Sequence, residues 1–511
     1  MATTMLPNQY PFPAPFNNAE DAEHELRVAD AEIWEKRGEI AAVSLFKEVS
    51  VRVPAYKDFL KKHKVNPDSI KTIADFSKLP TVDKNNYLRA YSLEDLSWDG
   101  KLMKEFQVYA STSGSTGEPF YFPRTRKQTE QYALLAELYL RSQYKIQDRK
   151  TLYVNCFAMG AWIGGLFTYQ ALEHLAESRY PLHLITPGLA KEEALKAIRK
   201  LGPMYDQVII GGYPPYVKDL IDQGTADGMN WKKYRIKYVF SAEGFSEKFR
   251  DYVAKAVGQD NTLRGSLNHY GTVDLGTMAY ETPVAAFVRR AALADKKFFK
   301  EFFGQAHRLP TLAQYLPEQF YFESVNDGLV CSADAGLPLI RYDLKDQGGI
   351  WKFEDAVQAV EKAVPGHKHA LKDAGIDDTV FKLPFVYLYE RADFTVVLYG
   401  ANVYPEHIRR ALEHKACSAF ATGKCTVRIV ESRTNEPRLE VNIELKRGVA
   451  PDSTFGKIAE KEITNTLLAD NSEYRSNHTH LQRKMRPRIK LWQFGDPKYF
   501  SGRGKQKWIE K

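Results

Sequence analysis

Strand-like and helix-like runs alternate along residues 105–350, and this alternation constrains the fold more than any other feature of the chain. Short runs rich in β-branched and aromatic residues predict strands, and longer runs with apolar residues every three or four positions predict helices. The predicted strands are residues 151–157, 183–186, 207–210, 237–241 and 266–270. The predicted helices are residues 125–144, 189–200, 214–223 and 247–257. Helices placed between strands predict an α/β fold with largely parallel pairing.

The flanking segments have a different pattern. Residues 20–65 carry apolar residues at helical spacing among charges, which predicts helices. Residues 284–318 mix basic residues with phenylalanines, and we predict an amphipathic helix packed on the core, with a lid or membrane-surface role as the alternative. Residues 354–375 predict another charged helix.

A chain of 511 residues is long enough for at least two domains. The pattern resets after Arg391-Ala392-Asp393, where short strand-like runs again flank helical ones. We therefore predict a large N-terminal domain over residues 1–392, with mixed and parallel sheets, and a small α+β domain over residues 393–511.

Composition narrows the class of protein. The net charge of +8, from 72 basic and 64 acidic residues, suits small anionic ligands such as a nucleotide and does not require nucleic acid. The four cysteines form no C-x-x-C pair, which is typical of a reducing compartment. We see no apolar signal segment and no run long enough to span a bilayer, so we expect a cytoplasmic protein.

A hydroxyl- and glycine-rich stretch, residues 111–119, follows a strand-like run. Its small residues let backbone N–H groups turn toward an anion, and its hydroxyls add donors, so it suits a polyphosphate. It is not the lysine-containing phosphate loop of other nucleotide enzymes, because no lysine follows Gly117. A flexible solvated turn is the alternative.

Other polar turns follow predicted strands or lie near the C-terminal end. Ligands of open α/β sheets bind beyond such strand ends. Asp274 is suited to Mg²⁺ or, alternatively, to capping a helix, and Asp346 is suited to a ribose diol or to an ordinary turn. Lys505 lies on a glycine-rich segment, where a lysine is either functional or simply solvated. The stretches that carry these residues are 241–244, 268–274, 338–346, 390–393, 400–405 and 501–507.

Taken in order, these motifs resemble those of the adenylate-forming superfamily, and most of all the phenylacetate–CoA ligase family. The resemblance covers nearly the whole chain, from Val53-Pro54-Ala55-Tyr56 to Leu439-Glu440-Val441 and the terminal Gly-Lys. It implies two half-reactions. A carboxylic acid attacks the α-phosphorus of ATP to give an acyl-adenylate and pyrophosphate, and a thiol, usually that of coenzyme A, then displaces AMP.

The resemblance also implies roles for individual residues. The β- and γ-phosphates would lie on Ser111, Thr112, Ser113, Gly114, Ser115, Thr116 and Gly117. Ala242, Glu243 and Gly244 would edge the adenine, with Tyr270 also in the nucleotide site, and Asp346 and Arg391 would fix the ribose. Asp274 would bind Mg²⁺. Lys505 would bridge the substrate carboxylate and the α-phosphate, and Asp393 would be the hinge on which the small domain swings.

Several positions depart from the family pattern. Glu118 stands where a lysine is common, Asp274 replaces a glutamate, and Glu390 replaces a glycine. The family usually has a Tyr-Gly-Tyr-Gly stretch where this chain has Phe157-Ala158-Met159-Gly160. Some relatives carry a cysteine knuckle in the region of residues 382–385, and this chain does not.

We predict that aromatic and soft side chains from three chain segments form one apolar acid pocket beside closely approachable backbone. The predicted pocket residues are Phe157, Met159, Trp162, Tyr213, Tyr270 and Gly271. Such a pocket favours a flat aromatic or apolar acid.

Three functions stay open. The first is an ATP-dependent acid–thiol ligase that uses coenzyme A. The second is an adenylating enzyme with an amine, a carrier-protein thiol or an inorganic nitrogen nucleophile as acceptor. The third is a nucleotide-binding relative without turnover, which the presence of both Asp346 and Lys505 disfavours. A homodimer is possible in each case.

Overall fold

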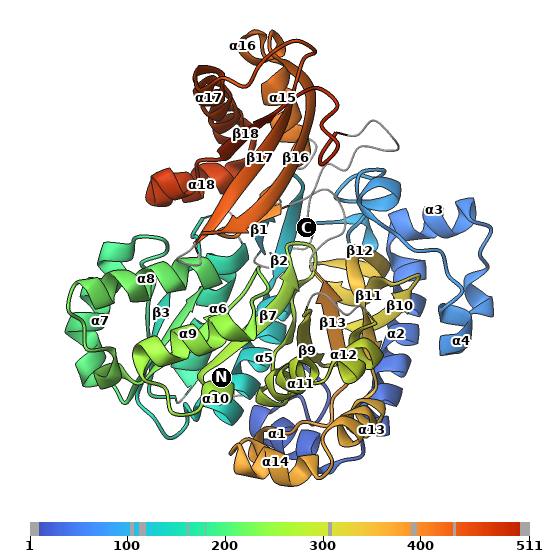
Figure 1. Ribbon diagram of the computed structural model, residues 1–511. Helices are drawn as coiled ribbons and strands as arrows, with labels where there is room; N and C mark the ends of the chain where they lie inside the picture. Colours follow the sequence, from blue (N-terminus) through green and yellow to red (C-terminus); the bar gives the residue numbers. More distant parts are fainter. Residues whose placement is uncertain are drawn as a thin grey trace.

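An eleven-stranded sheet runs through the large part of the molecule, in the order β10-β11-β12-β13-β9-β8-β7-β6-β5-β3-β4 (Figure 1). The computed structural model describes residues 10–102, 107–111, 119–160, 163–178, 180–304, 309–389, 396–432 and 436–500. Five neighbouring strands at one end of the sheet are parallel. They are β4 (Leu182–Ile185), β3 (Thr151–Asn155), β5 (Gln207–Gly212), β6 (Ile236–Phe240) and β7 (Ser266–Thr272). These are the strands predicted from the alternating pattern.

The other half of the sheet is antiparallel, so the sheet is mixed, as predicted, although the sequence pattern did not identify the individual antiparallel strands. Its strands are β8 (Gly276–Tyr280), β9 (Thr311–Tyr315), β10 (Tyr321–Val325), β11 (Gly328–Ala335), β12 (Leu337–Trp351) and β13 (Phe385–Tyr389). The pairing changes from parallel to antiparallel at β7. A tight turn at residues 273–275 joins β7 to β8, so the switch brings this turn to the carboxyl ends of the parallel strands.

Helices cover the parallel half. The long helix α5 (Arg126–Tyr144) is buried along most of its length and begins at Thr125, whose hydroxyl accepts a hydrogen bond from the Gln128 amide. It packs against α6 (Ile163–Ser178). The remaining helices of this half are α7 (Lys191–Leu201), α8 (Pro214–Ala226), α9 (Glu247–Val257) and α10 (Thr262–Gly265). The sequence predicted α5, α7, α8 and α9 within a few residues.

The N-terminal segment is helical, as predicted, and covers the antiparallel half. It contains α1 (Ala19–Val28), α2 (Ala31–Arg52), α3 (Pro54–Lys62) and α4 (Ile73–Phe76). Helix α2 packs against β10, β11 and β12. Gly38 is required in this helix, because a Cβ there would lie 2.4 Å from Cβ of Pro317.

The segment at 284–318 packs on the core, which confirms the first of the two alternatives. It forms α11 (Pro283–Ala294) and α12 (Lys296–Phe303) before entering β9. The four phenylalanines of α12 are buried against the next helix, α13 (Phe353–Ala363). The charged segment after residue 354 forms α13 and the short α14 (His367–Asp373). A hairpin of β1 (Gln107–Ser111) and β2 (Tyr121–Thr125) lies apart from the main sheet.

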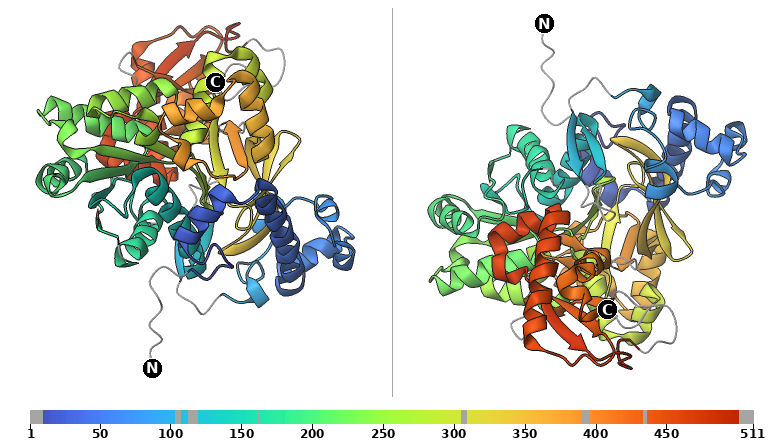
Figure 2. Two further views of the ribbon diagram at one scale, coloured as in Figure 1. Left: turned by 90° about the horizontal axis from the view of Figure 1, so that it is seen from below. Right: turned by 90° about the horizontal axis from the view of Figure 1, so that it is seen from above.

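A small unit follows residue 396 and lies over one end of the large part (Figures 1 and 2). In its three-stranded sheet β16 pairs antiparallel and β18 parallel with β17. Its elements are β14 (Val396–Leu398), β15 (Ala401–Val403), α15 (Pro405–Glu413), α16 (Lys415–Ser418), β16 (Ala421–Glu431), β17 (Pro437–Leu445), α17 (Ser453–Asp470), α18 (Ser472–Leu481) and β18 (Arg488–Trp492). The predicted division at 392/393 lies outside the described residues.

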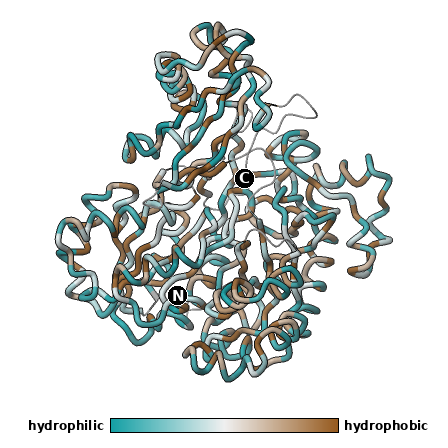
Figure 3. Tube along the Cα trace, viewed as in Figure 1, coloured by the Kyte–Doolittle hydropathy of each residue, from teal (hydrophilic) through white to brown (hydrophobic). Residues whose placement is uncertain are grey.

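Apolar residues fill the interior strands, and hydrophilic residues cover the outer turns (Figure 3). One buried cluster continues from β3, β5 and β6 into the sheet of the small unit. The two parts therefore share apolar packing in this arrangement. Within the described residues, the longest helices are too polar to cross a bilayer.

Candidate active site

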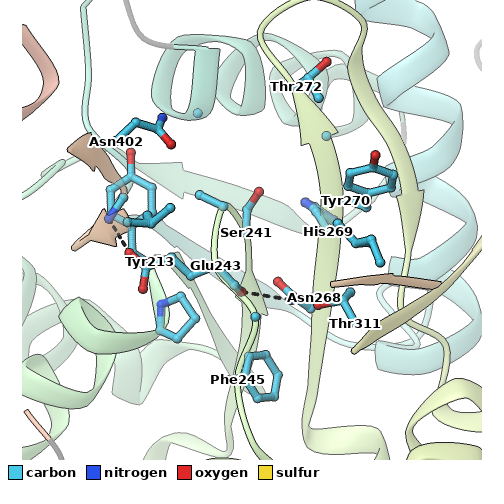
Figure 4. A pocket seen from close by; sticks show the side chains of 18 of the residues that line it. Tyr213, Ser241, Glu243, Phe245, Asn268, His269, Tyr270, Thr272, Thr311 and Asn402 are labelled. Atoms are coloured by element: carbon cyan, nitrogen blue, oxygen red, sulfur yellow. Dashed lines mark hydrogen bonds between the residues drawn. The ribbon is translucent and has the colours of Figure 1, made fainter. Parts of the chain in front are cut away.

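A cavity of about 770 Å³ lies between the carboxyl ends of the parallel strands and the small unit. The chain segments just beyond β5 and β6 contribute Tyr213 and residues 241–244, and the end of β7 with its following turn contributes residues 270–274 (Figure 4). Gly400, Asn402 and Glu473 line it from the small unit. The strand-end motifs predicted from the sequence therefore surround one space, as expected for an open α/β sheet.

Glu243 joins the two units. Its carboxylate accepts a hydrogen bond from the backbone amide of Gly400, and its carbonyl accepts one from Nδ2 of Asn268 at 3.1 Å. Gly400 has a φ of +82°, and a Cβ there would lie 2.7 Å from Cε1 of Tyr213. The small unit can approach this closely only because residue 400 is a glycine.

An ion pair between a half-buried lysine and a buried aspartate makes a second contact between the units. Nζ of Lys484, in the small unit, lies 2.6 Å from Oδ2 of Asp219 on α8. Burial raises the pKa of Asp219, and Lys484 opposes that shift. The same lysine lies 3.0 Å from Oε1 of Glu436, so both carboxylates hold it in place.

Tyr270 and Asp346 lie together in the cavity. The Tyr270 hydroxyl donates a hydrogen bond of 2.7 Å to Oδ2 of Asp346, and both residues are buried. Tyr270 also stacks on Phe322 with 6.0 Å between ring centroids. A carboxylate oriented in this way can accept hydrogen bonds from hydroxyl groups such as those of a ribose.

Asp274 lies in the turn between β7 and β8, and no helix begins there, so the helix-capping alternative is wrong. Its Oδ2 accepts a hydrogen bond of 2.5 Å from the Tyr342 hydroxyl and lies 3.3 Å from Nζ of Lys84. Among the described residues, no group of three or more His, Cys, Asp or Glu side chains is gathered for a metal ion. Asp274 on its own can bind Mg²⁺ only if substrate phosphates supply further oxygen ligands.

Four of the residues predicted for the acid pocket line the cavity: Phe157, Tyr213, Tyr270 and Gly271. The rings of Phe157 and Tyr213 meet edge to face, with centroids 5.4 Å apart. Met159 is not among the described lining residues and is 36% exposed, because it lies beyond the end of β3 in the loop that leads to α6. Trp162 lies outside the described residues.

Polar side chains also line this part of the cavity, and the sequence analysis did not identify them. Tyr132 and Thr168 lie on the packed helices α5 and α6, with their hydroxyl oxygens 3.2 Å apart. His269 lines the cavity from β7, and burial lowers its pKa to about 3, so its ring is neutral near pH 7. Thr277 lines it from β8. Tyr132 and Thr168 line the cavity only because α5 and α6 pack together, and no local sequence pattern reveals that packing.

The remaining predicted residues fall mostly outside the described ranges: Thr112, Ser113, Gly114, Ser115, Thr116, Gly117, Arg391, Asp393 and Lys505. Ser111 is the last residue of β1 and pairs with Tyr121, the first residue of β2. The predicted phosphate loop therefore lies between these two strands in sequence. Nη2 of Arg124, on β2, donates a hydrogen bond to the carbonyl of Val273. The hairpin is therefore fastened to the turn that carries Asp274.

The fold is that of solved CoA ligases. The solved structure of 2-hydroxyisobutyryl-CoA ligase in complex with 2-HIB-AMP and CoA, in the thioesterification state, matches with a TM-score of 0.66 at 15% identity. The match covers 98% of this chain and 94% of that one. The same ligase in a postadenylation state, bound to R3-HIB-AMP, gives a TM-score of 0.53 at 14% identity over 96% and 91% of the two chains.

In sequence the chain is phenylacetate–CoA ligase-like. It is 22% identical to the phenylacetate-coenzyme A ligase of Thermus thermophilus over 363 residues, which is 71% of each chain. It is 23% identical to that of Aromatoleum evansii over 296 residues, 58% of this chain and 61% of that relative. No family model matches the chain. These similarities confirm the resemblance found from the sequence motifs.

Proposed function

We propose that this protein is an AMP-forming acid–thiol ligase. It activates a carboxylic acid as an acyl-adenylate with ATP, releases pyrophosphate, and transfers the acyl group to a thiol, that of coenzyme A. The observation that carries the proposal is the convergence of Glu243, the Tyr270–Asp346 pair and Asp274 on one cavity that the small unit closes. Both relatives named above carry the name phenylacetate-coenzyme A ligase, which describes an acid–thiol ligase.

The nucleotide binds along the strand ends. Asp346, oriented by Tyr270, accepts hydrogen bonds from the ribose, together with Arg391, and residues 242–244 edge the adenine. The phosphates extend toward the turn at Asp274 and the loop at residues 111–117. Asp274 would hold Mg²⁺, which would offset charge on the phosphate oxygens.

The acid lies where Phe157, Tyr213 and Gly271 line the cavity. Phe157 and Tyr213 present ring faces and edges to a flat group, and the nearby Tyr132, Thr168 and neutral His269 supply no charge. An aromatic or similarly apolar acid fits this environment, because a second charged group on the acid would be buried without a counter-charge there.

The small unit serves the two half-reactions in turn. Lys505 stabilises the charge that develops between the carboxylate and the α-phosphate, and rotation about Asp393 then replaces it with the Gly400 loop. In the arrangement described here, Gly400 rests on Glu243 and Tyr213, and the higher TM-score belongs to a relative in its thioesterification state. Both observations support this arrangement as the one for thiol transfer.

The test is pyrophosphate release over a panel of carboxylic acids, with and without coenzyme A. Acid-dependent pyrophosphate release that coenzyme A turns from a single event into steady turnover supports the proposal. Turnover with amines or hydroxylamine but not with coenzyme A would keep adenylation and reject the thiol acceptor. Lys505→Ala is expected to slow acid-dependent pyrophosphate release by on the order of 10²–10³, whereas the matched Lys507→Ala is expected to retain the wild-type rate.

A further inference from the structure

Lys84 is the one cationic side chain among the described residues that line the cavity. The described lining also carries five carboxylates, from Glu243, Asp274, Asp346, Glu431 and Glu473. A nucleotide triphosphate brings further negative charge into this space. Its binding therefore depends strongly on every positive charge that reaches the phosphates.

The backbone holds Lys84 at this place. Val82 bridges in parallel with Tyr342: its amide donates to the carbonyl of Arg341 at 3.1 Å, and its carbonyl accepts from the Asp343 amide at 2.8 Å. Asp83 then caps the turn Lys84–Leu88 by accepting hydrogen bonds from the amides of Asn85 and Asn86. Lys84 is the first residue of this turn, so its backbone is fixed by β12 and the cap.

Lys84 and Tyr342 thus reach Asp274 from adjacent backbone segments. Both act on the same oxygen, Oδ2, at 3.3 Å from Nζ of Lys84 and 2.5 Å from the Tyr342 hydroxyl. The side chain of Asp274 is 3% exposed and that of Lys84 is 33% exposed. The lysine therefore sits on the open side of the carboxylate, where its flexible stem can turn to a ligand while the aspartate stays fixed.

We propose that Lys84 is a polyphosphate-binding residue, which exchanges its contact with Asp274 for the β- and γ-phosphates of ATP. This inference rests on the function proposed above. With Mg²⁺ bound, Asp274 would not need Lys84 as its counter-charge, and the ammonium group of Lys84 would be available to the phosphates.

The test compares the binding of ATP and of AMP by calorimetry, with no acid present. Lys84→Met is expected to weaken ATP binding about 10- to 100-fold, the effect of one charge-assisted hydrogen bond, and to leave AMP binding unchanged. Lys127→Met is the matched control, because Lys127 makes a comparable pair with Asp334 at 2.5 Å and is not among the lining residues. Lys84→Gln is measured alongside, with thermal unfolding of each variant, to separate lost folding from lost binding.

The outcomes distinguish this inference from the proposed function. If the wild-type protein binds neither nucleotide, the proposed function is contradicted. If it binds both and the folded Lys84 variants bind ATP as tightly, or lose ATP and AMP equally, only the role of Lys84 is contradicted.

A second variant tests the exchange itself. Without metal, Asp274→Asn is expected to bind ATP more tightly than the wild type, because it frees Lys84 and removes a negative charge. The gain is expected to be smaller when Asp274→Asn is introduced into Lys84→Met, because only the removed negative charge then contributes. An equal gain in both backgrounds would contradict the exchange.

Discussion

The backbone amide of Gly400, in the small unit, donates a hydrogen bond to the carboxylate of Glu243, just beyond β6 in the large part. Beside this bond, the Gly400 backbone faces the Tyr213 ring with no room for a side chain. The contact therefore couples the position of the small unit to two residues of the cavity wall.

Gly400→Ala tests this coupling. The added methyl group would meet the Tyr213 ring at 2.7 Å and would strain a backbone with φ of +82°. Such strain is of the order of 1–3 kcal/mol, so we expect thiol transfer to slow about 5- to 150-fold while adenylate formation continues. Single-turnover kinetics of each half-reaction measure this. Equal slowing of both half-reactions would show that the contact does not belong to thiol transfer alone.

The Asp219–Lys484 pair is the second contact that holds the small unit in place. Lys484→Met is expected to slow thiol transfer about tenfold, because it leaves a buried carboxylate without its cation. Asp219→Asn combined with Lys484→Met is expected to recover part of that loss. Arg410→Met, which breaks a pair with Asp470 inside the small unit, is the control and should leave the rate unchanged. If the losses in activation free energy of the two single variants simply add in the double variant, a direct coupling between Asp219 and Lys484 is contradicted.

His269 predicts a pH dependence of stability. Burial lowers its pKa from 6.5 to about 3, so between these values the unfolded chain binds a proton that the folded chain excludes. Stability is therefore expected to fall as the pH drops below 6.5, by up to about 1.4 kcal/mol per pH unit from this residue. His269→Gln should reduce that slope in urea unfolding, and His369→Gln should not, since the side chain of His369 is 82% exposed. An unchanged slope in His269→Gln would show that the histidine does not titrate in this way.

Tyr270→Phe removes the hydroxyl that orients Asp346 at 2.7 Å. Loss of one hydrogen bond to a carboxylate predicts roughly three- to tenfold weaker binding. We expect ATP and AMP to be affected alike, since both carry the ribose, unlike the selective effect expected at Lys84. Tyr109→Phe, on an exposed tyrosine of the hairpin, serves as the control. Loss of ATP binding alone would place Tyr270 against the phosphates instead.

The parallel half of the sheet could be predicted from the sequence because each of its strands is followed by a helix with its own apolar spacing. The antiparallel half could not, because its pairing depends on distant partners: β13 pairs with β9 across α13 and α14. The strand-end residues Glu243, Tyr270 and Asp274 were identifiable because strand ends converge at one sheet edge. Lys84 was missed, because only the bridge between Val82 and Tyr342 brings it to Asp274.

The most direct measurement follows the carboxylate oxygen of the acid. The acid identified by the panel is labelled with oxygen-18 in its carboxylate, the reaction with ATP and coenzyme A is run to completion, and the nucleotide product is examined by mass spectrometry. Attack of the carboxylate on the α-phosphorus predicts AMP that carries one labelled oxygen, together with unlabelled pyrophosphate. ADP as the nucleotide product, or AMP without label, would contradict an acyl-adenylate and with it the function proposed for this protein.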